Sequence, residues 1–93
     1  MALYLGDVKS NVATSSNVVF AGPARVRSIY YKANTSAGSI LVKDGGSGGS
    51  TVISIATSAN AYGNVVIPGD GVLCTSNVYV ALTNVDSATV FYS

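Results

Sequence analysis

The sequence predicts an all-β fold, a single antiparallel β-sandwich of jelly-roll-like type. Its 93 residues are enough for one small domain, because single domains mostly span ~50–200 residues. Residues that favour pleated sheets dominate, with 14 Val, 5 Ile, 7 Thr and 6 Tyr. No Glu or Gln is present to form helix capping boxes. Turn signals divide the chain at short, regular intervals, which is typical of sandwiches and barrels.

The chain begins with a segment unlike the rest. After Leu3–Tyr4–Leu5, residues 1–16 are small and polar with little to bury, so they predict an extended N-terminal arm. Such an arm could pair with a neighbouring molecule or lie along the domain. The sandwich domain, residues 17–93, is expected to hold about eight short strands. These are residues 17–21, 24–33, 39–44, 51–57, 64–67, 72–75, 78–83 and 89–92.

Glycine and proline mark the connections between these strands. Gly22–Pro23 ends the first strand, because Pro cannot donate to a ladder. The long strand 24–33 has no cleanly apolar face, which predicts a bulge or bend near Tyr30–Tyr31. Pro68–Gly69 fits a type II turn, where Gly supplies a positive φ. Residues 45–50 predict a hairpin loop and not a phosphate-binding loop, since no Lys ends them and a strand follows.

Composition excludes most catalytic chemistry. The absence of His removes imidazole acid–base catalysis and His metal sites. Asp44 and Asp70 each adjoin a Gly in a turn, where Asp commonly caps its own backbone. The sequence therefore predicts a protein that is not an enzyme, with no catalytic residue, no cofactor and no bound metal.

Charge and hydropathy exclude two classes of partner. Five Lys and Arg against four Asp, a net charge of +1, make no basic stripe for nucleic acid. The apolar runs are a few residues long, whereas a membrane-spanning helix needs ~20. The N-terminus has no basic region or apolar stretch of a secretory signal, so we expect no export by that route. Cys74 stands alone and predicts a buried thiol.

Basic and aromatic residues concentrate on one expected strand. Arg25, Arg27 and Lys32 lie there with Tyr30 and Tyr31. Arg and aromatic residues are enriched at protein interfaces, so these residues indicate contact with a partner or an ordinary sheet surface. The candidate contact residues are Leu3, Tyr4, Leu5, Arg25, Arg27, Tyr30, Tyr31 and Tyr62. A competing hypothesis is that the protein is a carbohydrate-binding module that uses Tyr30, Tyr31 or Tyr62.

Four motifs follow one another between about residues 20 and 93. They are KDGG at 43–46, IPGDG at 67–71, YVALTN at 79–84 and TVFY at 89–92. In this order and spacing the chain resembles small virion structural proteins of tailed bacteriophages, of the cyanophage and marine phage type. The resemblance implies a structural, non-enzymatic role on the particle. It leaves residues 1–16 uncovered.

Together these points predict a capsid decoration, or cement, protein on the outside of the virion, assembled in the host cytoplasm. Its expected partners are the major capsid protein and itself, as a homotrimer. A trimer at a three-fold position would bridge several capsid subunits, and multivalency would strengthen weak contacts. The arm would suit strand addition to a neighbour. A phage tail or fibre component is the alternative.

Overall fold

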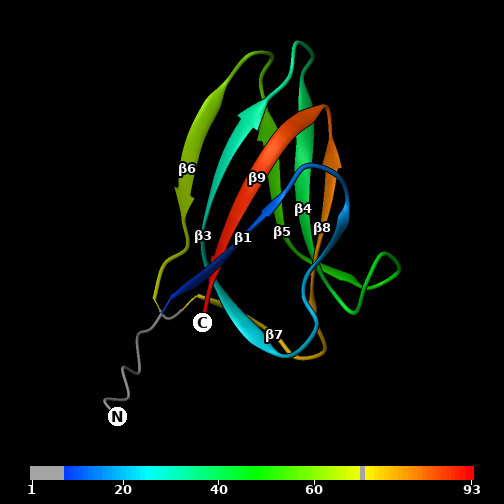
Figure 1. The fold of residues 1–93 in the computed structure, drawn as a ribbon, viewed down its shortest axis with the longest axis vertical. Coiled ribbons are helices and arrows are strands. Elements are labelled where there is room, and N and C mark those ends of the chain that lie inside the picture. The colour runs from blue at the N-terminus through cyan, green and yellow to red at the C-terminus, as the bar shows by residue number, and fades with distance from the viewer. Residues whose placement is uncertain (1–7, 70) are drawn as a thin grey trace.

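Two antiparallel sheets packed face to face make up the structure, a computed structural model that describes residues 8–69 and 71–93 (Figure 1). Sheet A has the order β1-β9-β3-β6, with β7 also paired to β3, and sheet B has the order β2-β8-β4-β5. The described residues contain no helix, and the predicted β-sandwich is confirmed. The strands are β1 (Lys9–Ala13), β2 (Asn17–Phe20), β3 (Ala24–Ala33), β4 (Gly38–Asp44), β5 (Ser50–Thr57), β6 (Tyr62–Val66), β7 (Val72–Cys74), β8 (Val78–Thr83) and β9 (Val85–Tyr92).

The strand order is that of a rolled-up ribbon. Apart from the short β7, the strands form nested pairs around the β4–β5 hairpin: β4 pairs with β5, β3 with β6, β2 with β8 and β1 with β9. Each of β8 and β9 has a second neighbour: β8 also pairs with β4, and β9 also pairs with β3, and these pairings join the strands into two sheets. Two interlocked Greek keys of this kind define a jelly roll. The expected jelly-roll-like topology is therefore the observed one.

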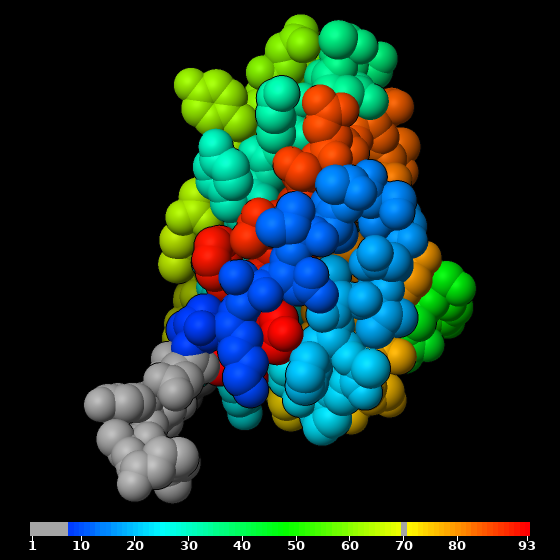
Figure 2. Space-filling model, viewed as in Figure 1, coloured from blue at the N-terminus to red at the C-terminus, as the bar shows by residue number. Residues whose placement is uncertain are grey.

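The first strand corrects the predicted boundary between arm and domain. Residues 9–13 fall in the expected arm, yet they form β1 and pair with β9 from Lys9↔Tyr92 to Ala13↔Ala88 (Figures 1 and 2). Of the two expected placements, this part of the arm lies along the domain. Only Ala13 of β1 is buried, so the alternation that reveals a half-buried strand is missing here. The sandwich thus has nine strands and begins before residue 17.

The long strand β3 changes its inward-facing residues, as expected, but at another place. Ala24 and Val26 are buried on one side of the switch, and Ile29 and Ala33 on the other. The register against β9 slips between Val26 and Ser28, so the bulge lies at Arg27 and not near Tyr30–Tyr31. A bulge inverts the faces of every residue that follows it.

The last strand is longer than expected. β9 begins at Val85, whereas the sequence predicted a loop up to Ser87. A single residue, Asn84, joins β8 in sheet B to β9 in sheet A with a φ of 54°. Asn tolerates this left-handed conformation, and the chain needs no longer loop to change sheets. The register between β9 and β3 shifts a second time, between Lys32 and Ala33, and Asp86 is the extra residue of β9 at this shift.

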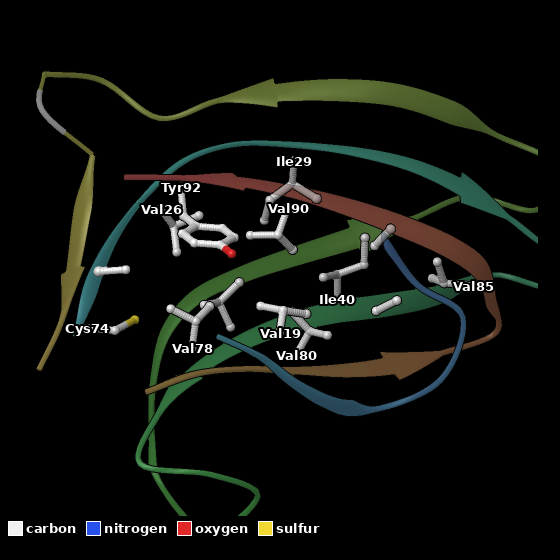
Figure 3. Close-up of a cluster of buried hydrophobic side chains, with 14 residues drawn as sticks. Val19, Val26, Ile29, Ile40, Cys74, Val78, Val80, Val85, Val90 and Tyr92 are labelled. Atoms are coloured by element: carbon white, nitrogen blue, oxygen red, sulfur yellow. The ribbon is translucent and has the colours of Figure 1, made fainter. Parts of the chain in front are cut away.

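β-Branched side chains fill the space between the sheets (Figure 3). Ile29 and Val90 of sheet A face Ile40 of sheet B, and none of the three has exposed surface (Figure 3). The rings of Phe20 on β2 and Tyr92 on β9 add an aromatic contact between the sheets, with centroids 5.0 Å apart. Fully buried side chains on both layers make the two sheets interdependent.

One carboxylate joins two loops at the end of the sandwich nearest β7. Asp44 accepts hydrogen bonds from the Thr75 N–H at 2.9 Å, the Thr75 hydroxyl at 2.9 Å and the Ser76 N–H at 2.8 Å. In return, the Asn77 side-chain oxygen accepts from two N–H groups of the glycine-rich loop. The N–H donors hold the pKa of Asp44 below its ordinary value. Asp44 therefore has a structural role, but it caps a distant loop instead of its own backbone.

The neighbouring thiol is buried, as predicted. Cys74 has no exposed surface, and burial, followed by the charge of Asp44, raises its pKa.

Candidate interaction surface

The outward side of sheet A carries three of the chain's basic residues together with exposed aromatic residues. Successive residues of a strand point to opposite faces, so the buried Ile29 and Val90 place Tyr30 and Thr89 outward. We call this outward side the sheet A face. Its rows follow the register of the strands: Val12–Thr89–Tyr30–Asn64, Ser10–Phe91–Ser28–Val66, Ser87–Lys32–Tyr62 and Arg25–Leu73.

This face carries most of the large hydrophobic side chains that are exposed among the described residues. Seven large hydrophobic side chains are exposed among the described residues, and five lie here, between 45% and 74% exposed. They are Val12, Tyr30, Tyr62, Val66 and Leu73. Clustering of this kind, more than an isolated exposed side chain, distinguishes a contact surface.

Positive charge accompanies the apolar groups. Arg25 is exposed on the face, and the Arg27 guanidinium is held by a hydrogen bond of 2.8 Å from its Nε to the Ser93 hydroxyl. Lys32 lies 3.9 Å from the Asp86 carboxylate. Three cations thus face a single carboxylate among the described residues of this surface. The combination suits a partner that is apolar and acidic.

Four of the predicted contact residues lie together on this face, and one does not. Arg25, Arg27, Tyr30 and Tyr62 are all on it. Tyr31 points to the opposite side, where it packs against the core and its ring lies over Gly63. Adjacent residues of a strand cannot share a face, so Tyr30 and Tyr31 have separate roles.

The three remaining predicted contact residues, Leu3, Tyr4 and Leu5, lie outside the described residues.

Sequence reasoning missed the aliphatic part of the face. Val12, Val66 and Leu73 each sit in a short strand whose inward and outward sides the sequence does not distinguish. These three residues can be assigned to the face only from the register of their strands with β3 and β9, which is known only from the folded sheet.

A metal centre and a membrane-spanning helix are both absent from the described part of the chain. There, no three His, Cys, Asp or Glu side chains gather where they could hold a metal ion. Nor do residues 8–69 and 71–93 contain any helix that could cross a membrane. Comparison with protein-family models, curated proteins and solved structures found no match in any of the three.

Proposed function

We propose that this protein is a non-enzymatic structural protein of a tailed-bacteriophage particle, a decoration protein that binds the outside of the assembled capsid. The sheet A face carries this proposal, because it combines exposed hydrophobic side chains with cations on a rigid sheet. The motifs described above supply the phage assignment. Jelly rolls are common among capsid and lectin domains, which agrees with this role without defining it.

The charge of the face favours a partner different from this chain. Two copies joined through the same face would bring Arg25 and Arg27 of both into one interface, where like charges repel. The proposed partner surface is therefore an apolar, acidic patch of the major capsid protein. Contacts that make the homotrimer use another surface. Three faces acting together would bind far more tightly than one, through effective concentration.

A matched pair of substitutions tests the docking face. Val66 on β6 is 72% exposed on the sheet A face, and Val18 on β2 is 42% exposed on the outward side of sheet B. Val66→Glu puts a carboxylate against an acidic partner, and we expect at least about a tenfold loss of affinity for capsids assembled without this protein. Val18→Glu should bind like the wild type. Equal binding by both variants would exclude the sheet A face as the docking surface.

The number of copies per virion separates capsid from tail. A decoration protein is present at near-stoichiometric amounts relative to the major capsid protein, whereas a tail or fibre component is present in few copies. Densitometry of purified virions measures this ratio. A few copies per particle would reject the capsid role in favour of the tail or fibre.

A shortened chain tests the predicted contact of Leu3, Tyr4 and Leu5. Removing residues 1–7 leaves every residue of β1 in place. If the arm binds the shell, this chain is washed from particles sooner than the full chain. Unchanged retention would confine the contact to the sandwich.

A further inference from the structure

A polar cleft opens at the end of the sandwich opposite the Asp44 loops. It lies where the β3–β4, β5–β6 and β8–β9 connections meet, the upper end in Figures 1 and 2. Its volume is about 430 Å³, within the range of ~300–1,000 Å³ that small-molecule sites occupy. The residues that line it are Lys32, Ala33, Asn34, Thr35, Asn60 and Asp86.

Backbone hydrogen bonds fix the walls of this cleft. The Asn60 N–H donates to the Asn34 carbonyl at 2.7 Å, and the Ala33 N–H donates to the Ala61 carbonyl at 2.7 Å. The Asn34 N–H in turn donates to the Asn84 carbonyl at 3.1 Å. Three connections that are distant in sequence are thereby tied together. A ligand would enter a preformed site and lose little affinity to ordering it.

The polar side chains of the cleft offer donors and acceptors without excess charge. Lys32 Nζ and Asp86 Oδ2 are 3.9 Å apart, beyond hydrogen-bond distance, so both keep their capacity to bond a ligand. The Asn34 side-chain oxygen accepts from the Ser36 N–H, which leaves its amide hydrogens as donors. Thr35 adds a hydroxyl. One cation balanced by one anion favours a neutral ligand with many hydroxyl groups over phosphates or acidic sugars.

An exposed aromatic ring stands beside the cleft. Tyr62 is 74% exposed and lies directly opposite Lys32 in the ladder, so the two side chains share one side of the sheet. The apolar C–H face of a sugar ring packs well on an aromatic ring, while its hydroxyl edge is left for polar groups. We propose that this cleft binds a neutral saccharide, with a pyranose ring against Tyr62 and its hydroxyls bonded to Lys32 and Asp86. Tyr62 and Lys32 also belong to the sheet A face, so the two proposals share these residues and need variants that separate them.

Titration of the full-length protein with sugars tests the proposal. Amide chemical shifts are followed by NMR as D-glucose, D-galactose, D-mannose, N-acetyl-D-glucosamine and, separately, sialic acid are added. We expect saturable shifts with at least one neutral sugar, largest at Asn34, Thr35, Asn60 and Tyr62, with a Kd of about 1 mM. The proposal would be overturned if none of the neutral sugars gave saturable shifts, or if sialic acid alone did.

Two tyrosines provide a matched control. Tyr62→Ala should weaken saccharide binding by at least about tenfold. Tyr30→Ala should not, because Tyr30 is exposed on the same face but lies opposite Asn64, one row from the Lys32–Tyr62 pair, and does not line the cleft. An equal loss in both variants would mean general adhesion to the sheet and would reject the site. Val66→Glu should bind sugar normally, so failure of capsid docking and failure of this site are separate results.

Discussion

Replacing Ile40 by Ala tests how the two sheets hold together. Ile40 lies on the inner strand β4 with no exposed surface, and its ladder partner Ile55 lies on the edge strand β5, half-buried. Ile→Ala removes the equivalent of about three methylene groups, each worth about 0.8 kcal/mol when fully buried. With the cavity left behind, Ile40→Ala should cost about 3–4 kcal/mol of unfolding free energy. At Ile55, where the site is partly open and can relax, we expect about 1 kcal/mol.

These losses are large enough to measure. A domain of this size has a total unfolding free energy of about 5–14 kcal/mol, so Ile40→Ala removes a substantial part of it. Urea unfolding can be followed by near-ultraviolet circular dichroism of the tyrosines, because the chain has no Trp. The reactivity of the buried Cys74 thiol gives an independent probe of the same transition. Equal losses at the two positions would refute the reasoning, because they would mean that Ile40 is not enclosed between the sheets.

Three further perturbations follow from the structure. Gly38→Ala should prevent folding to soluble protein, since a Cβ there would lie 1.8 Å from a backbone oxygen of β8, whereas Gly48→Ala, with nothing within 4 Å, should be neutral in soluble yield. Asp44 has a folded-state pKa below its ordinary value of 3.8, so its contribution to stability is full above that value and is lost as the pH falls through the folded-state pKa. Asp44→Asn should therefore melt below the wild type at neutral pH, with a gap that narrows in thermal scans below pH 3.8; a constant gap would contradict this. Deleting residues 1–12 removes four of the five β1 residues and should lower the melting temperature, and an unchanged value would show that β1 contributes no stability.

The sequence predicted best where side chains alternate regularly. β8 has the bounds expected, and its valines are buried at alternate positions, since burial itself enforces the period of two. β3 also has the bounds expected, although its alternation is broken by the bulge at Arg27. β1 was not predicted because it is held in place by pairing with β9, while its own side chains are mostly exposed. The start of β9 depends on a one-residue change of sheet at Asn84, a feature of the packed layers and not of local composition.

The candidate surface was predicted in part for the same reason. Arg25, Arg27 and Tyr30 are recognisable by residue type alone, because such side chains concentrate at interfaces. Tyr31 has the same type but the opposite direction, and its direction follows from the bulge at Arg27. Val66 became part of the face only through its register with Ser28. Residue type thus indicates chemistry, while register decides which residues act together.

The rolled ribbon also constrains when the protein can fold during its synthesis. β8 lies between β2 and β4, and β9 lies between β1 and β3, so one of the two inner positions of each sheet belongs to residues 78–92. Until the ribosome releases this segment, β1 and β2 have no ladder partner and neither sheet can close. Nascent chains therefore gain most of their stability only once residues 78–92 have left the ribosome, through contacts between segments distant in sequence that form slowly. A chain terminated before residue 78 lacks both β8 and β9, so it can close neither sheet and offers no folded sandwich for assembly.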